Sequence, residues 1–92
     1  MHGVEVIAGH SIRVYDDGGR TIDRYTVVFM DQPEHSFICG RSFACLGMNG
    51  APFHPQGFCQ HSQARIGTHL GKRIAFSSLP DDCQRAVRQE WQ

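Results

Sequence analysis

Two β-prone runs separated by a glycine-rich turn constrain the fold of this chain most strongly. The runs are residues 12–15 and 21–30, and DDGGR at residues 16–20 lies between them. The Asp-Gly and Gly-Gly steps supply the positive φ that tight hairpin turns require. Residues 11–30 are therefore predicted to form a β-hairpin.

The second run is apolar on both of its faces. Tyr25, Val27 and Phe29 share one face, because successive side chains of a strand alternate. Val28 and Met30 share the other face. A strand that is apolar on both sides is typical of the middle of a sheet, so we expect neighbouring strands on either side of it.

The other strands are less sharply indicated. Residues 31–34 are expected to be a turn, because Pro33 lacks the backbone N–H that a central strand needs. Residues 43–48 fit either a strand or a short helix. Further strands are expected at residues 36–39 and 72–76, with residues 4–8 as an extra edge.

The C-terminal residues predict an amphipathic helix. Ser77 or Ser78 can cap it, Pro80 suits its first turn, and two aspartates follow at the positive end of the helix dipole. Its apolar residues recur at helical spacing and form one stripe: Leu79, Cys83, Ala86, Val87 and Trp91. This stripe is expected to cover one face of the sheet.

The length of 92 residues fits a single domain, residues 1–92. Residues 50–57 hold two prolines and two glycines, which excludes regular structure there. The predicted fold is α+β: an antiparallel sheet of three to four strands, one C-terminal helix packed on it, and a long irregular loop. Loops of this length are often binding elements.

The sequence contains no apolar run long enough to span a bilayer and no visible signal peptide. We therefore expect the protein to stay in the cytosol where it is made. Its four cysteines, Cys39, Cys45, Cys59 and Cys83, are then expected to be reduced thiols.

Charge is segregated along a chain that is neutral as a whole. The first 40 residues hold six acids against three bases, and residues 41–73 hold four bases and no acid. A basic segment rich in aromatic residues and glycine favours an anionic partner. The candidate charge contacts are Arg41, Arg65, Lys72 and Arg73, and the candidate loop contacts are Phe53, His54 and Phe58. The phenylalanines alternatively pin the loop to the core.

The acidic N-terminal half is the alternative surface. It would dock on basic protein subunits that normally hold nucleic acid, through Asp16, Asp17, Asp23 and Glu34. The Asp16-Asp17 pair also has a local explanation as part of the hairpin turn.

No catalytic motif is present in recognisable form. His54, Cys59, His61 and His69 are all possible zinc ligands, but their H-x4-C-x-H-x7-H spacing matches no common zinc module. The glycines of GTHLGKR at residues 67–73 are one residue too close for a phosphate loop, and Arg follows the Lys. We therefore expect no catalytic residues, no metal, no cofactor and no small-molecule substrate.

Three segments carry a family resemblance. They are DRYTVVF at residues 23–29, FHPQGF with QH at residues 53–61, and HLGKRI with LP at residues 69–80. Together they resemble a family of small proteins from phages, prophages and plasmids, and the chain is similar to anti-CRISPR proteins directed at type I surveillance complexes.

This resemblance implies a non-enzymatic inhibitor. Its partners would be protein subunits of a type I CRISPR surveillance complex, beside the guide RNA, and its effect would be to block target DNA binding. A neutral chain does not mimic duplex DNA, because a mimic is strongly acidic. The alternative is a stand-alone nucleic-acid-binding module that uses the basic segment 41–73; such binders usually carry a basic excess.

Overall fold

The computed structural model describes residues 5–7, 9–35, 41–57 and 59–90. In this part of the chain one antiparallel sheet carries six strands, followed by a C-terminal helix. The strands are β1 (Glu5–Ile7), β2 (His10–Asp16), β3 (Tyr25–His35), β4 (Arg41–Met48), β5 (Cys59–Ala64) and β6 (Lys72–Ile74). Two short 3-10 turns, η1 (Thr68–Leu70) and η2 (Phe76–Ser78), precede the helix α1 (Asp81–Glu90).

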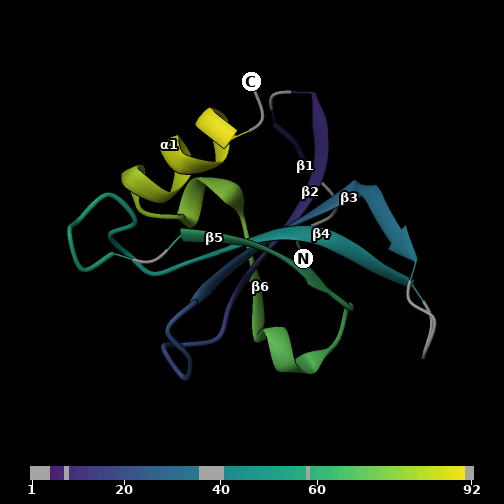
Figure 1. Cartoon of the computed structure of the whole chain (residues 1–92), viewed down its shortest axis with the longest axis horizontal. Coiled ribbons are helices and arrows are strands. Elements are labelled where there is room, and N and C mark those ends of the chain that lie inside the picture. The colour runs from purple at the N-terminus through teal and green to yellow at the C-terminus, as the bar shows by residue number, and fades with distance from the viewer. Residues whose placement is uncertain (1–4, 8, 36–40, 58, 91–92) are drawn as a thin grey trace.

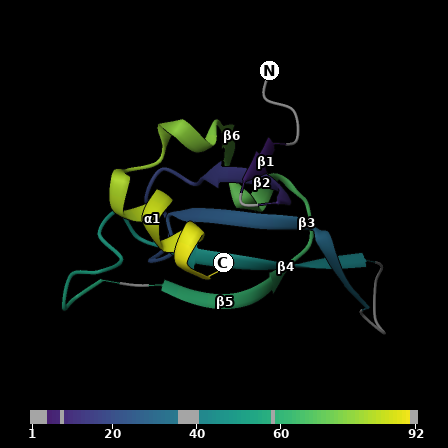
Figure 2. The ribbon, with the colours of Figure 1, turned by 90° about the horizontal axis from the view of Figure 1, so that it is seen from above.

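The strands from β1 to β5 lie in chain order, and β6 pairs with β2 (Figure 2). One edge of β2 pairs with β3, so β1 and β6 share its other edge. Ser11 and Ile12 pair with residues of β1, and Val14 and Tyr15 pair with residues of β6. The expected α+β class is therefore confirmed, and the expected edge strand at the N-terminus is β1.

The predicted hairpin is confirmed as β2 and β3, joined by the hairpin loop, residues 17–24. Gly18 and Gly19 adopt φ of 78° and 90°, as the turn requires. β3 lies between β2 and β4 in the sheet, and its two faces pack into two separate apolar clusters. The central position expected for this strand is therefore confirmed.

The helix α1 covers one face of the sheet (Figure 1). The predicted stripe is buried at Leu79, Cys83, Ala86 and Val87, while Trp91 lies outside the described residues. These side chains pack on the main core, whose strand residues are Ile12, Val14, Tyr25, Val27, Phe29, Leu46 and Met48. Ser77 and Ser78 lie in η2 rather than at the start of the helix.

The opposite face of the sheet, here called the open face, carries the smaller cluster. It consists of Tyr15, Val28, Cys45 and Leu70, with Met30, Phe43 and Ala64 packed beside them. Leu70 comes from residues 65–71, the crossing segment, which runs from β5 at one edge of the sheet to β6 at the other. The crossing segment therefore lies over the open face, on the side away from α1 (Figure 1).

Two local predictions need correction. Residues 31–34 are not a turn, because β3 continues to His35 with a register shift between Val28 and Pro33. In the described part of the chain, β3 pairs beyond Phe29 with β4 and no longer with β2, so Pro33 lies at a strand edge where its missing N–H is tolerated. The sheet is also larger than the three to four strands expected, because Cys59–Ala64 is a strand.

The remaining local predictions have mixed outcomes. Residues 43–48 are strand rather than helix, and residues 49–57 are irregular as expected. The strand expected at residues 36–39 lies outside the described residues. In the described part of the chain, no helix has the length and apolar character needed to cross a membrane.

Candidate functional site

A groove lies on the open face, beneath the crossing segment. Its volume is about 530 Å³. It is lined by Asp23, Thr26, Ser42, Cys45, Gly47, Gln60, Ser62, Gln63, Ala64, Arg65, His69 and Leu70. The strand residues come from β3, β4 and β5, and the others come from the hairpin loop and the crossing segment.

The topology creates this groove. Because β5 and β6 lie at opposite edges of the sheet, the chain between them must cross the open face. Leu70 is 8% exposed and anchors the crossing to the cluster around Tyr15 and Val28. The crossing ends at Gly71, whose φ of 95° turns the chain close to the backbone of the hairpin loop. The crossing segment is thus attached both at its middle and at its end.

The two ends of the groove carry opposite charges. Asp23 lies over Gly47, where an added Cβ would come within 3.0 Å of the Asp23 side chain. Gly47 of β4 pairs with Gln60 of β5. Arg65 directly follows Ala64, which pairs with Phe43, and Phe43 lies four residues from Gly47 along β4. A carboxylate therefore stands near one end of the groove and a guanidinium near the other, with hydroxyl and amide groups between them.

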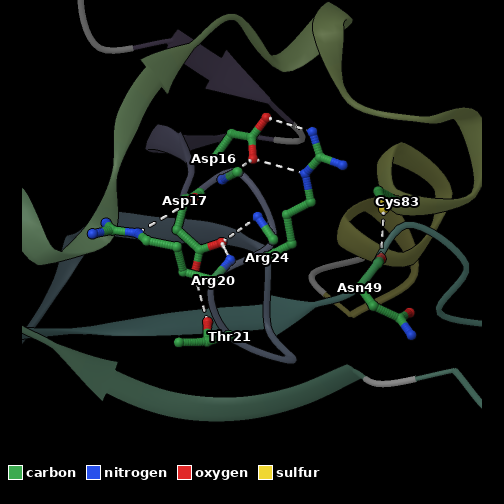
Figure 3. A network of polar contacts seen from close by, with 9 residues as sticks. Asp16, Asp17, Arg20, Thr21, Arg24, Asn49 and Cys83 are labelled. Atoms are coloured by element: carbon green, nitrogen blue, oxygen red, sulfur yellow. Dashed lines mark hydrogen bonds and ion pairs between the residues drawn. The ribbon is translucent and has the colours of Figure 1, made fainter.

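A network of polar contacts orders the hairpin loop beside the groove (Figure 3). Arg24 donates two hydrogen bonds to the carboxylate of Asp16, from Nε to Oδ1 at 2.8 Å and from Nη2 to Oδ2 at 3.2 Å. The hydrogen bond from Arg24 is the main reason that the pKa of Asp16 lies below its ordinary value. The Thr21 hydroxyl contacts carboxylate oxygens of both Asp17 and Asp23.

Asp17 is held by the loop itself. Its Oδ1 accepts hydrogen bonds from the amides of Gly19, at 2.8 Å, and Arg20, at 3.0 Å. Burial by itself raises the pKa of Asp17, but the Thr21 hydroxyl and these amides outweigh that effect and lower it. Three of the four acids of the alternative surface, Asp16, Asp17 and Asp23, therefore gather in or directly before the hairpin loop, where each accepts hydrogen bonds from loop residues. Glu34 lies near the far end of β3, where it pairs with Ser42, and its side chain is outside the described part of the structure.

The candidate basic residues whose side chains are described do not form a single patch. Arg65 lines the groove and is exposed. Lys72 and Arg73 lie on β6, at the other edge of the sheet, where Lys72 pairs with Asp16 and Arg73 with Tyr15. Arg41 begins β4, but its side chain lies outside the described part of the structure.

The candidate loop contacts lie on the helix side instead. Phe53 is 45% exposed, and the Arg85 guanidinium of α1 lies 4.7 Å from the centre of its ring. Nδ1 of His54, which is also exposed, accepts a hydrogen bond from the amide of Gln56 at 3.1 Å. The Cys83 thiol donates to the carbonyl of Asn49 at 3.2 Å, which ties the loop to α1 (Figure 3). Phe58 lies outside the described residues.

The structure adds one arginine that the charge pattern along the chain misses. Arg13 lies on β2, two residues before Tyr15, and therefore on the same open face as Arg73 of β6. It belongs to the net-acidic first 40 residues, so a search for basic stretches passes over it. Only the pairing of β2 with β6 brings it near the basic segment.

The described residues contain no group of three or more His, Cys, Asp or Glu side chains placed to hold a metal ion. Of the suggested zinc ligands, His54 lies in the loop beside α1 and His69 in the crossing segment. Cys59 and His61 lie on β5. Burial raises the pKa of Cys83 to about 11, which keeps that thiol protonated.

Comparisons of the chain with protein-family models, with curated proteins and with solved structures found no match.

Proposed function

We propose that this chain is a non-enzymatic binding protein of a mobile genetic element that inhibits a type I CRISPR surveillance complex in the bacterial cytosol. The observation that carries the proposal of binding is the groove on the open face. The choice of partner comes from the family resemblance of the three sequence segments. In this proposal a protein subunit of the complex occupies the groove and target DNA binding is blocked.

The surroundings of the groove favour a protein partner. Ile22 is 66% exposed and Ile66 is 40% exposed, and each neighbours a groove-lining residue, Asp23 and Arg65 respectively. Exposed apolar side chains beside a polar groove are a feature of protein interfaces. The charges at the groove ends are of both signs, which suits the mixed surface of a protein better than a uniform polyanion.

The acidic hairpin loop is the weaker choice of surface. The Asp16 carboxylate is engaged by Arg24, and that of Asp17 by backbone amides and a hydroxyl. A partner would have to displace these contacts before it could use either carboxylate. Arg65 is exposed at the groove and can contact a carboxylate of the partner.

The test is a pull-down of a purified type I surveillance complex with the tagged chain, followed by a target DNA binding assay. We expect the wild-type chain to retain the complex and to reduce its DNA binding. Arg65→Glu should weaken both effects at least tenfold, because truncating or reversing a desolvated charge typically costs about 2–5 kcal/mol. Arg88→Glu, at an exposed position on α1, is the matched control.

Two results would count against the proposal. The first is a wild-type chain that neither retains the complex nor affects its DNA binding. The second is equal inhibition by Arg65→Glu, with folding verified, which would exclude the groove as the surface. Tight binding to naked RNA or DNA at ~150 mM salt would instead indicate the stand-alone nucleic-acid-binding module.

A further inference from the structure

The geometry points to a phosphate-binding site on the open face, formed by Arg13 and Arg73, that contacts the backbone of a single-stranded nucleic acid. This inference goes beyond the proposed function, because it does not depend on which macromolecular complex the chain binds. It rests on the strand register, on the burial of Arg13 and on the distribution of carboxylates between the two faces of the sheet.

The register places the two arginines next to each other. Arg73 of β6 pairs directly with Tyr15 of β2, and its guanidinium carbon lies 5.9 Å from the centre of the Tyr15 ring. Arg13 lies two residues from Tyr15 on the same strand face, so it is the diagonal neighbour of Arg73. Diagonal neighbours are about 7–8 Å apart, within reach of long side chains. One phosphate group can therefore contact both guanidinium groups.

Arg13 has an unsatisfied buried donor. Its Nε atom is buried and has no hydrogen-bond partner among the described residues, although the side chain as a whole is only half-buried. Buried polar atoms in folded proteins are nearly always paired, and an exception calls for a reason such as an absent ion. Burial has removed water from the Nε of Arg13 without supplying a hydrogen-bond acceptor, which costs free energy. An anion bound at the two outer nitrogens of the guanidinium would offset part of that cost.

The described strand carboxylates lie on the other face of the sheet. Glu5 accepts a hydrogen bond from the Phe76 amide at 2.7 Å, against the core beneath α1. Asp31 contacts His10, whose ring packs edge-on against Phe29 of the same core. Asp16 alternates with Tyr15 and therefore points away from the open face. The carboxylates of the described strands are thus separated from Arg13 and Arg73, and Asp23 of the hairpin loop is the acid that stands on the open face, at the groove.

A phosphodiester fits this site better than a lone carboxylate. A phosphodiester has two charged oxygens, as a carboxylate has, but its oxygens are arranged tetrahedrally rather than in a plane, so they can accept hydrogen bonds from two guanidinium groups that approach from different directions. The site lies beside the groove, since Tyr15 pairs with Arg73 on one side and with Thr26, a groove residue, on the other. A nucleic acid held by the two arginines would therefore run next to the protein subunit that is proposed to occupy the groove.

The site predicts weak binding by the free chain. One or two phosphate contacts on a neutral protein give a dissociation constant on the order of 10⁻⁴ M or weaker at physiological salt. The measurement therefore uses the full chain labelled with ¹⁵N at low salt. The arginine Nε–H resonance of Arg13 is followed during separate titrations with inorganic phosphate, a short single-stranded RNA, the DNA of the same sequence, and polyglutamate.

We expect phosphate and both nucleic acids to shift the Arg13 resonance, and polyglutamate to leave it in place. A larger effect of RNA than of DNA would assign the source to RNA, and equal effects would assign it to the shared phosphodiester. If neither nucleic acid moves the resonance, the inference is wrong. If polyglutamate moves it and the nucleic acids do not, the site binds an acidic protein surface instead.

Variants provide a second readout by fluorescence anisotropy with labelled RNA. Arg13→Gln should lower the salt dependence of log K by roughly 0.7, the value of one phosphate contact on a single strand. Arg13→Lys should retain part of the binding, because it keeps the charge but not the planar fork. Arg20→Gln, an equal change of charge in the exposed hairpin loop, should bind as wild type.

The outcomes also separate this inference from the proposed function. A chain that binds nucleic acid through Arg13 but ignores the surveillance complex refutes the proposed function alone. A chain that inhibits the complex while its Arg13 resonance is insensitive to nucleic acid refutes the phosphate site alone.

Discussion

Replacing Gly71 by alanine is predicted to destabilise the protein strongly, because two separate effects add. Gly71 has a φ of 95° and a ψ of −152°, a region that is almost restricted to glycine and that costs other residues about 1–3 kcal/mol. An added Cβ would also lie 2.4 Å from the carbonyl oxygen of Asp16 and 2.5 Å from the Cα of Asp17. Both atoms belong to the backbone, so relief requires the crossing segment or the hairpin loop to move.

The clash adds roughly 1–3 kcal/mol, the usual range for overpacking. The total is therefore about 4 kcal/mol, a large part of the 5–15 kcal/mol that stabilises a typical domain. With a slope of roughly 1.5 kcal/mol/M in urea, the unfolding midpoint should fall by about 2.7 M. Urea titrations followed by far-UV circular dichroism measure this directly.

Gly19→Ala is the matched control for the clash. Gly19 has a similar φ of 90°, but an added Cβ would meet no atom within 4 Å. This variant should lose only the backbone term, about 1–2 kcal/mol. The reasoning is refuted if Gly71→Ala loses no more stability than Gly19→Ala, because the close approach of the crossing segment to the hairpin loop would then carry no energy.

Three further predictions concern single side chains. Because burial raises the pKa of Cys83 to about 11, thiol reagents at pH 8 should modify the exposed Cys59 well before Cys83, and comparable rates would contradict the burial of Cys83. Because the pKa of Asp16 is lowered in the folded state, its contribution to stability is present above the unfolded pKa of 3.8 and is lost as the pH falls. Asp16→Asn should therefore lose less stability towards urea below pH 4 than the wild type does. The difference should be no more than about 1 kcal/mol, because the ion pair of Asp16 with Arg24 is at the surface. Leu70→Ala should lower the free energy of unfolding by about 2–3 kcal/mol, because it leaves a cavity in the cluster beneath the crossing segment. An unchanged denaturation midpoint would show that Leu70 does not anchor the segment there.

The elements that the sequence predicted well are those whose own residues carry the pattern. The hairpin is indicated by glycines, which adopt positive φ in the turn, and the helix is indicated by an apolar stripe, which is buried in the structure. β5 carries no such signal, because Cys59–Ala64 has five exposed residues in succession and no alternation between apolar and polar side chains. Its strand conformation is imposed by pairing with β4 along its whole length.

The candidate site was less predictable for a related reason. Of the candidate charge contacts, Arg65 lines the groove, but Lys72 and Arg73 lie at the other edge of the sheet. Charge along the chain does not say which face of a sheet a residue will occupy, since that depends on strand register. Arg13 and Arg73 are sixty residues apart, and the pairing of β6 with β2 makes them diagonal neighbours on the sheet.

The return of β6 to β2 also decides the order in which the protein can be assembled during synthesis. Val14 pairs with Ile74, and a ribosome that adds about 5–20 residues per second delivers the second residue several seconds after the first. The meander from β2 to β5 needs only neighbouring segments and can form in the meantime. Closing so long a loop is entropically unfavourable until the sheet exists to receive it. The edge of β2 that faces away from β3 is paired with β1 over half of its length. The other half therefore stays unpaired in the nascent chain until β6 has emerged.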